Sequence, residues 1–156
     1  MIQHPVCVYN NWSAYDELSD AVELTEEIAL RQLEQLLRWR SLGARMDYYL
    51  VDAFWYDRAS GFQQFRQPHW PDGPDRFLNL CQENNIKPGL WLPGNNQSPN
   101  AKLDVYPTWS DSWNPAQRSL CMFTGGYLPH LLEIMDLWYQ RGVSAFKFDF
   151  LNINAI

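Results

Sequence analysis

The sequence predicts an α/β fold with a parallel sheet, and three observations support this prediction. Four short β-prone runs alternate with three amphipathic stretches, in the order strand, helix, strand, helix, strand, helix, strand. Strands separated by helices are joined by right-handed crossovers, which makes neighbouring strands parallel. The chain has 156 residues, which suits one domain, and its 46% apolar content is too high for a disordered chain. We therefore treat residues 1–156 as a single domain.

The first half of the chain contains two predicted strands and a helix between them. Val6–Tyr9 is a short β-prone run, and Tyr48–Val51 is a second one that places Asp52 at its carboxyl end. Thr25 is the predicted N-cap of the helix, because two glutamates follow it in the first turn, and Gly43 is the predicted stop. The apolar stripe of this helix consists of Ala29, Leu33, Leu36 and Leu37.

The second half continues the same alternation. A helix is predicted from Pro74 to about Glu83, because proline suits the first turn. Ile86–Leu92 is the third strand, and Pro93–Arg118 is a long connection without a sustained period. A third helix is predicted to begin at Pro129 and to stop at Gly142. Ala145–Phe148 is the fourth strand, and it ends at an aspartate.

Two architectures fit this order: an open doubly wound sheet, or the first half of an eight-stranded barrel. A complete barrel needs about 250 residues, so this length suits only part of one. The sequence also stops a few residues after the fourth strand, without the helix that should cover that strand. We therefore expect a fragment, namely a partial (β/α)8 TIM barrel with about the first four strands, three helices and a parallel sheet.

Charge and hydropathy exclude several functions. The net charge is −6 without a lysine or arginine cluster, so we expect no nucleic-acid partner. No apolar stretch approaches the roughly 18 residues of a membrane span, so no membrane partner is expected. No signal peptide is visible at the start of the sequence, which favours a cytoplasmic location.

Metal ions and cofactors are not expected either. The three histidines share no ligand spacing, and the three cysteines lie far apart. We predict that the cysteines are reduced and behave as small buried hydrophobes. These residues are His4, His69, His130, Cys7, Cys81 and Cys121.

Polar and aromatic side chains gather at the carboxyl ends of the predicted strands, where parallel β/α folds bind ligands. Carboxylates combined with flat apolar rings suit a sugar, because hydroxyl groups need acceptors and C–H faces need a stacking surface. The sequence therefore predicts an oligosaccharide or glycoside as the partner. The polar members are Asn11, Asp52, Asn95, Asn96, Lys147 and Asp149, and the aromatic members are Trp12, Phe54, Trp55, Trp91, Trp109 and Trp113.

The most specific local feature is Phe146-Lys147-Phe148-Asp149. Side chains alternate along a strand, so Lys147 and Asp149 share one face, with backbone positions roughly 6.6 Å apart. The ammonium favours an ionised Asp149, and an ionised carboxylate at a strand mouth can act as a nucleophile. A purely structural ion pair at the end of the strand is the alternative interpretation.

Four segments, in the right order over nearly the whole chain, resemble the melibiase-like α-galactosidases of glycoside hydrolase clan D. The Lys147–Asp149 segment is similar to the Lys-Trp-Asp or Lys-Tyr-Asp motif of that family. The segments are Asn11–Ala14, Tyr49–Trp55, Trp70–Gly73 together with Ile86–Trp91, and Phe146–Asp149.

The resemblance implies retaining hydrolysis of terminal α-glycosides on a β/α barrel. It makes Asp149 the nucleophile, Lys147 and Asp52 the contacts to sugar hydroxyls, and Trp12 a wall of the pocket. Trp55 and Trp91 complete the predicted set of substrate-binding residues. In the family the acid/base follows a later strand, beyond Ile156, so the isolated chain is expected to be inactive.

Two departures from the family pattern bear on the substrate. Ala53 replaces a second consecutive aspartate, which puts galactose itself in doubt, and Pro93-Gly94-Asn95 replaces a Glu-Pro-Glu segment. Two other functions stay open. Lys147 could form a Schiff base as in barrel aldolases, or the chain could be a non-catalytic module for sugar binding or assembly. We also expect self-association, or association with the remaining half of the barrel, because an open parallel sheet leaves edges uncovered.

Overall fold

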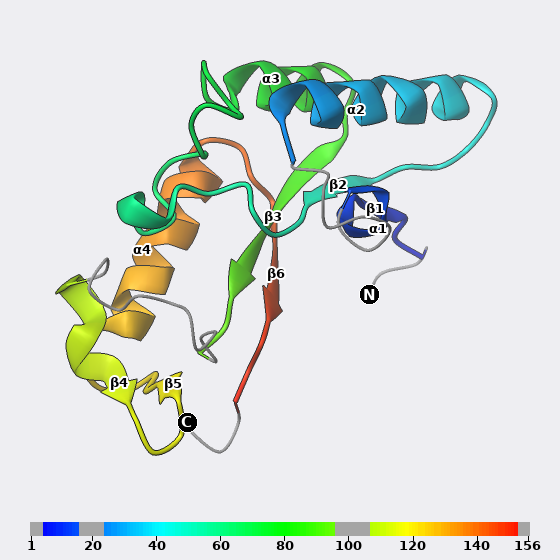
Figure 1. Ribbon diagram of the computed structural model, residues 1–156. Helices are drawn as coiled ribbons and strands as arrows, with labels where there is room; N and C mark the ends of the chain where they lie inside the picture. The colour runs from blue at the N-terminus through cyan, green and yellow to red at the C-terminus, as the bar shows by residue number, and fades with distance from the viewer. Residues whose placement is uncertain (1–4, 16–23, 96–106, 153–156) are drawn as a thin grey trace.

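The computed structural model describes residues 5–15, 24–95 and 107–152, and it confirms the α/β class with a parallel sheet (Figure 1). The sheet consists of β1 (Val8–Asn10), β2 (Tyr48–Val51), β3 (Lys87–Pro93) and β6 (Ala145–Asp149). The longer helices are α2 (Glu26–Ser41), α3 (Asp75–Glu83) and α4 (Tyr127–Gln140). Shorter elements are α1 (Trp12–Tyr15), η1 (Arg58–Ser60), η3 (Pro107–Ser112), β4 (Trp113–Asn114) and β5 (Ser119–Leu120).

The sheet has the strand order β1-β2-β3-β6, and every neighbouring pair is parallel. Spatial order therefore follows chain order without reversal. A barrel has this sequential order, whereas a doubly wound sheet reverses its order at a switch point. The register places Leu50 beside Gly89 and Gly89 beside Ala145, so the carboxyl ends of the strands meet at one edge of the sheet.

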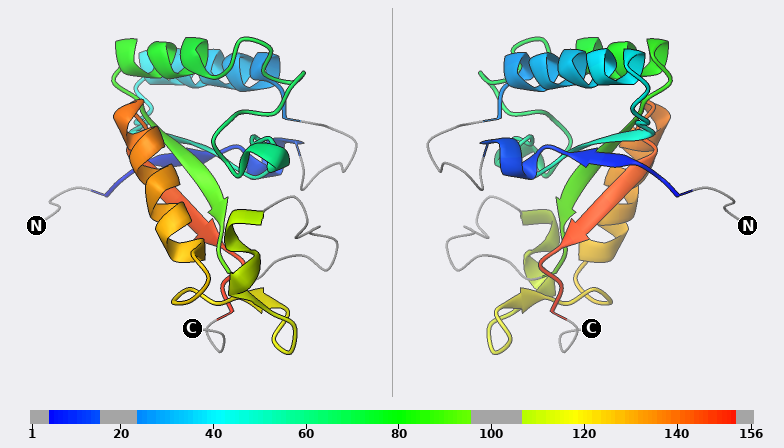
Figure 2. Two further views of the ribbon diagram at one scale, coloured as in Figure 1. Left: turned by 90° about the vertical axis from the view of Figure 1, so that its left-hand side faces the viewer. Right: turned by 90° about the vertical axis from the view of Figure 1, so that its right-hand side faces the viewer.

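One face of the sheet packs against the helices. Side chains at alternate positions of the central strands, such as Tyr49 and Leu90, are buried on this face. Tyr49 meets the ring of Phe77 from α3 at 5.0 Å between centroids, and its hydroxyl donates to Gln32 of α2 at 2.5 Å. The helices α2 and α3 lie side by side, and α4 runs along the part of the sheet that contains β3 and β6 (Figure 2).

A cluster of aromatic rings fills the space between the β2–α3 connection and α4. The ring of Phe65 lies 4.6 Å from Trp55, 4.6 Å from Trp70 and 5.2 Å from Trp138, measured between centroids. The indole N–H of Trp138 donates to the carbonyl oxygen of Phe62 at 2.8 Å. This cluster fixes the connection that follows β2, and it is not among the features predicted from the sequence.

Helix α2 has the predicted cap, because the hydroxyl of Thr25 accepts a hydrogen bond from the N–H of Ile28 at 3.2 Å. The first strand begins at Val8 rather than at Val6. Helix α4 begins at Tyr127, two residues before the predicted Pro129. Gly126 has a φ of 90°, and the Ser112 hydroxyl accepts from the N–H of Tyr127, so the helix starts directly after the glycine turn.

Two further predictions from the sequence concern the state of the cysteines and membrane-spanning segments. All three cysteines are free thiols, but only Cys81 is buried, so the prediction of burial is wrong for Cys7 and Cys121, which are half-buried. Burial raises the pKa of the Cys81 thiol to about 12. Within the described ranges, no helix has the length and apolar character that crossing a bilayer requires.

Candidate active site

Lys147 lies between two carboxylates at the carboxyl end of the sheet. Its Nζ atom is 2.7 Å from Oδ2 of Asp52 and 4.0 Å from Oδ2 of Asp149. The parallel register produces this arrangement, because Lys147 on β6 is level with Trp91 on β3. Asp52 directly follows Val51, whose register partner is Leu90, so Asp52 reaches the same level from β2. Two strands, β2 and β6, thus bring a cation and two anions to one edge, on either side of β3.

Asp52 is buried and its oxygens are engaged. Its side chain is only 1% exposed. Oδ1 accepts from the N–H of Ala53 at 2.8 Å, while Oδ2 accepts from Lys147. The N–H of Asp52 in turn donates to Oδ1 of Asn11 at 2.8 Å, which ties the end of β1 to the end of β2. Asp52 is therefore held in place through its backbone from the end of β1 and through its carboxylate from β6.

Asp149 is more accessible, with 46% of its side chain exposed. Oδ1 accepts from the N–H of Phe150 at 2.8 Å, and Oδ2 faces Lys147. The Asp149 carbonyl accepts from the N–H of Gly94 at 2.5 Å, so the end of β3 holds the end of β6. A side chain at position 94 would lie within 2.8 Å of that carbonyl oxygen. Asp149 thus combines a fixed backbone with a carboxylate that a ligand can reach.

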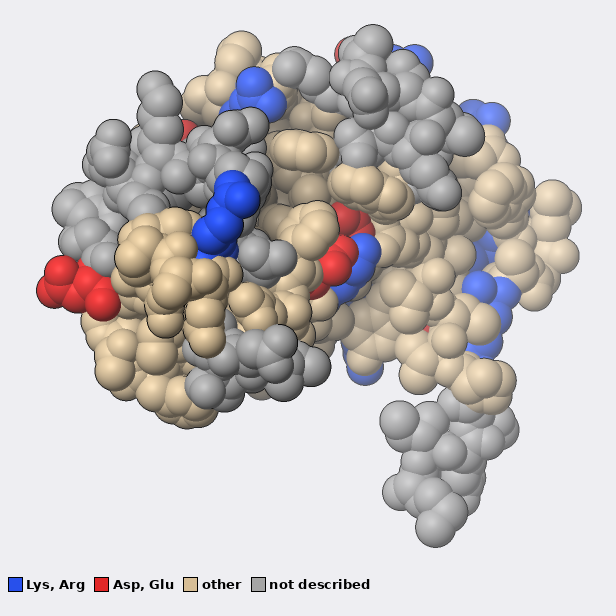
Figure 3. All heavy atoms as spheres, turned by 60° about the horizontal axis from the view of Figure 1, so that its bottom comes forward, with Lys and Arg blue, Asp and Glu red and all other residues tan. Residues whose placement is uncertain are grey.

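The side of the molecule beyond the strand ends is shown in Figure 3. Acidic and basic side-chain atoms adjoin one another in the middle of this face, among uncharged residues. A glycoside has both hydroxyl groups and C–H faces, and such a mixed surface can meet both.

The predicted aromatic residues occupy different environments. Trp12 is half-buried and stacks on Phe54, with ring centroids 6.3 Å apart. Trp91 is only 4% exposed and stacks on Tyr56 at 6.2 Å with an interplanar angle of 4°. The edge of Phe150 also meets Trp91, at 6.1 Å. Trp12 and Trp91 therefore lie beside the strand ends, in contact with other rings.

Trp55 and Trp109 are core residues in the structure. Trp55 is fully buried, and its indole N–H donates to the carbonyl oxygen of Trp91 at 2.7 Å. Trp109 is also buried, stacks on Phe62 and meets the edge of Tyr127. Both rings therefore belong to the hydrophobic core rather than to the site formed by Asp52, Lys147 and Asp149.

Asn95 and Asn96 were also predicted at this edge. Asn95 is fully buried and forms two hydrogen bonds with the backbone of Asn152, at 2.7 and 3.1 Å. It connects the segment after β3 with the segment after β6. Asn96 lies outside the described residues.

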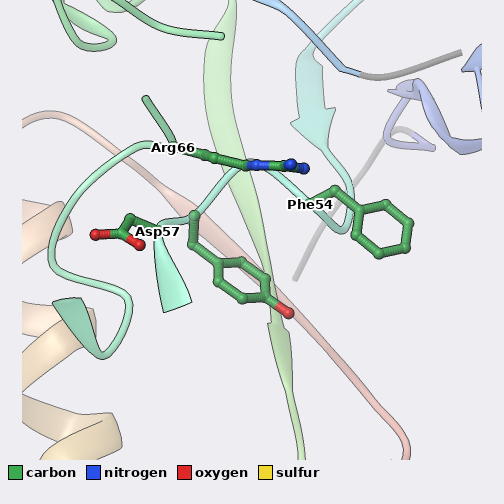
Figure 4. A pocket seen from close by; sticks show the side chains of 4 residues that line it. Phe54, Asp57 and Arg66 are labelled. Carbon is green, nitrogen blue, oxygen red and sulfur yellow. The ribbon is translucent and has the colours of Figure 1, made fainter. Parts of the chain in front are cut away.

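A pocket of about 440 Å³ lies beside the end of β2 and was not anticipated from the sequence (Figure 4). It is lined by Phe54, Tyr56, Asp57 and Arg66. These residues belong to the β2–α3 connection, which has no periodic pattern that would reveal them. One signal in the sequence could have indicated the pocket. The β2–α3 connection contains side chains of opposite charge and aromatic rings, and it begins at the edge of the sheet where ligands bind.

The described residues contain no group of three or more histidine, cysteine or acidic residues that could hold a metal ion. Lys147 already fills the space between Asp52 and Asp149. The arrangement is therefore suited to binding hydroxyl groups and to presenting a carboxylate to a reacting carbon.

No family model matches the chain, and no curated protein sequence matches it either. Solved structures do match. The α-galactosidase of Lactobacillus brevis matches with a TM-score of 0.66 and 18% identity, over 94% of this chain and 20% of that chain. A putative α-galactosidase of Bacteroides fragilis matches with a TM-score of 0.62 and 20% identity, over 95% of this chain and 26% of that chain.

A GH36 α-galactosidase of Geobacillus stearothermophilus, solved in complex with stachyose, matches with a TM-score of 0.62 and 17% identity, over 94% of this chain and 21% of that chain. The chain therefore spans only 20 to 26% of the length of these three proteins. At such low identities the likeness concerns the fold. The backbone of this chain is similar to part of each of these glycoside hydrolases.

Proposed function

We propose that this chain is part of a retaining α-glycoside hydrolase of the melibiase-like α-galactosidase type, acting on terminal α-galactosides or related sugars. The observation that carries the proposal is the position of Lys147 between Asp52 and Asp149 at the carboxyl end of a parallel sheet. The fold likeness to α-galactosidases and the four sequence segments support it.

Asp149 is the proposed nucleophile. One of its carboxylate oxygens forms a bond to the anomeric carbon, while the bond from that carbon to the leaving oxygen breaks. Water then hydrolyses the glycosyl ester and regenerates the carboxylate. The 46% exposure of the side chain allows a sugar to approach it, and Nζ of Lys147 lies 4.0 Å from its Oδ2 atom.

Lys147, whose side chain is 33% exposed, is the proposed direct contact to sugar hydroxyls, and the buried Asp52 takes part in this contact by holding Lys147 in position. The leaving oxygen needs a proton from a second carboxyl, about 5–5.5 Å from the nucleophile in a retaining enzyme. Asp52 is a poor candidate for this acid, because it is buried and both of its oxygens already accept hydrogen bonds. We assign the acid/base to a later strand of a complete barrel, so the chain alone should not turn over substrate.

The contacts of Lys147 with Asp52 and Asp149 also argue against the aldolase function. An amine that attacks a carbonyl must be available to it, whereas Nζ of Lys147 donates a hydrogen bond to Asp52 at 2.7 Å and lies 4.0 Å from Asp149. Borohydride reduction in the presence of a carbonyl substrate would trap an adduct on Lys147 if the aldolase function were correct. The hydrolase function requires that no such adduct forms.

The decisive experiment is covalent labelling with an activated fluoroglycoside, in a protein that supplies the remaining strands of the barrel. We expect Asp149→Asn to abolish the label, because the amide is a much weaker nucleophile than the carboxylate. Asp136→Asn is the matched control, since Asp136 is exposed on α4 and should leave labelling unchanged. Labelling that persists in Asp149→Asn would exclude Asp149 as the nucleophile. Glycoside binding without any label would support the non-catalytic sugar-binding module.

A further inference from the structure

Two exposed phenylalanines adopt a backbone conformation that favours glycine. Phe54 has a φ of 71° and Phe150 has a φ of 55°. A bulky side chain in this left-handed region costs free energy, because its Cβ atom comes too close to the following carbonyl oxygen. Such conformations persist only where the surrounding structure imposes them, and they cluster at sites that hold ligands. The two backbone conformations therefore point to a use for the rings that they present.

Phe62 has nearly the same backbone conformation in a different environment, and it serves as a comparison. Its φ is 72°, but its ring is only 2% exposed and stacks on Trp109 at 6.1 Å between centroids. Burial of this ring in the core offsets the cost of its backbone. Phe54 and Phe150 are 39% and 57% exposed, so core packing explains their conformations far less well.

Both exposed phenylalanines follow a carboxylate of the proposed active site. Phe54 comes two residues after Asp52, and Phe150 comes directly after Asp149. In both turns, Oδ1 of the carboxylate accepts from the N–H of the next residue at 2.8 Å. The turn that fixes each carboxylate thus leads directly into the left-handed residue. The charged groups and the two rings are therefore placed by the same two turns.

The two rings also belong to a row of aromatic residues along the strand ends. Phe54 stacks on Trp12, with ring centroids 6.3 Å apart and an interplanar angle of 21°. Phe150 meets Trp91 edge to face at 6.1 Å, and Trp91 stacks on Tyr56. Tyr56 and Phe54 line the same pocket of about 440 Å³. We call these five residues the aromatic row, which extends from the end of β1 to the end of β6.

We propose that Phe54 and Phe150 bind the leaving group of the glycoside, and that this group presents a flat apolar face. The proposal rests on the proposed function, since it names the class of glycoside that the same site receives. Lys147, the proposed contact to the sugar hydroxyls, is level with Trp91 of the aromatic row. A group attached to the anomeric carbon of that sugar would therefore lie against neighbouring rings. A phenyl ring and the C–H face of a second sugar both have the required chemistry.

Titration calorimetry on the full chain tests this inference without any catalytic turnover. The probes are the methyl and phenyl α-galactosides and the disaccharide melibiose, in which glucose is the aglycone. The methyl and phenyl α-glucosides and isomaltose form a second set, because Ala53 leaves the preferred sugar open. We expect the better of the two larger aglycones to increase affinity about tenfold over the methyl glycoside, since two rings contact it. A larger gain from phenyl identifies an aryl aglycone, and a larger gain from the disaccharide identifies a second sugar.

Variants of the two rings should reduce this gain. We expect Phe54→Gly and Phe150→Gly each to lower it about threefold, while the affinity for the methyl glycoside changes less than about twofold. Phe54→Tyr should retain the gain, because the stacking surface is preserved. Trp39→Ala is the matched control, since Trp39 is a 48% exposed ring on α2, outside the aromatic row, and its removal should leave the gain unchanged.

A stability measurement separates ligand binding from a structural role of the rings. Glycine adopts a positive φ without strain, so Phe54→Gly and Phe150→Gly should not lower the urea midpoint of unfolding. Phe62→Gly should lower it clearly, because a buried ring is lost from the core. Four results would each overturn the proposal: equal binding of methyl and larger glycosides, absence of binding, a gain that survives both glycine variants, or a loss of midpoint in these variants as large as that of Phe62→Gly.

The outcome is separable from that of the hydrolase proposal. Covalent labelling reports on Asp149, whereas the gain in affinity reports on the two rings. If the label persists in Asp149→Asn but the wild-type chain prefers the larger aglycones, the aromatic row stands and the nucleophile does not. If Asp149→Asn abolishes the label and the methyl and larger glycosides bind equally, the hydrolase stands and the leaving group proposed for the rings is wrong.

Discussion

His130 is a titratable residue that the fold holds in a largely apolar environment. Its Nε2 atom lies 2.8 Å from the carbonyl oxygen of Gly61, and its ring packs against Trp109 at 4.2 Å between centroids. Burial lowers the pKa of His130 from its ordinary value of 6.5, although the Gly61 carbonyl and Glu133 act in the opposite direction. The fold therefore favours the neutral ring, which donates from Nε2 to Gly61.

This environment predicts a loss of stability on acidification. The unfolded chain takes up the proton near the ordinary pKa of 6.5, before the folded chain does. The contribution of His130 is therefore complete above about pH 6.5 and decreases as the pH falls through the lower pKa of the folded state. Urea unfolding between pH 7.5 and pH 5 measures this loss, and NMR titration of the ring measures the pKa. His130→Gln should flatten the profile, and a pKa above 6.5 in the folded protein would contradict the argument.

Individual residues of the charged cluster were predictable only in part. The two-residue period of a strand places Lys147 and Asp149 on one face, and the structure confirms that they approach to 4.0 Å. The closer partner of Lys147 is Asp52, which comes from a strand that is not adjacent to β6. That pairing depends on the register between strands, which a single sequence does not display. Arg66 was missed for a similar reason, because the bridge that presents it joins irregular segments.

Among the elements, α2 offers the clearest test of local sequence signals. Removing the Thr25 hydroxyl leaves the N–H of Ile28 without its side-chain acceptor. We expect Thr25→Ala to lower the free energy of unfolding by about 1 kcal/mol, whereas Thr25→Ser should retain most of the stability. Chemical denaturation of the two variants measures the difference. Equal losses in both would show that the methyl group of Thr25, rather than its hydroxyl, is the stabilising part.

The accuracy of the predicted elements follows the strength of their end signals. β2 has the predicted bounds, and α2 follows its predicted cap, because a strong apolar run and an N-cap specify them. The predicted start of α4 at Pro129 is too late, because Gly126 in left-handed geometry allows the helix to begin at Tyr127. The short elements η1 and β4 were not predicted from the sequence. They lie in connections between the longer elements, and segments of two or three residues are too short to show a hydrophobic period.

At the scale of the whole molecule, the sheet formed by the described residues ends at two edge strands. β1 and β6 each have one hydrogen-bonded neighbour in the sheet, and Val8 and Phe148 on these strands are 54% and 38% exposed. Such edges can pair with strands from other molecules. We expect concentration-dependent association of the chain in sedimentation velocity experiments, reduced by combining Val8→Lys with Phe148→Lys. A monodisperse monomer that unfolds cooperatively at all concentrations would contradict this expectation.

The contact between Gly94 and the backbone of Asp149 has a consequence for how this site can change. The proposed nucleophile is positioned by a neighbouring strand at a point where even a methyl group would meet the carbonyl oxygen at 2.8 Å and the side chain of Leu151 at 2.6 Å. Enlarging residue 94 should therefore misalign the reacting carboxylate even if the sheet tolerates the change. Libraries that aim at new glycoside specificity can vary Phe54, but they should keep position 94 as glycine.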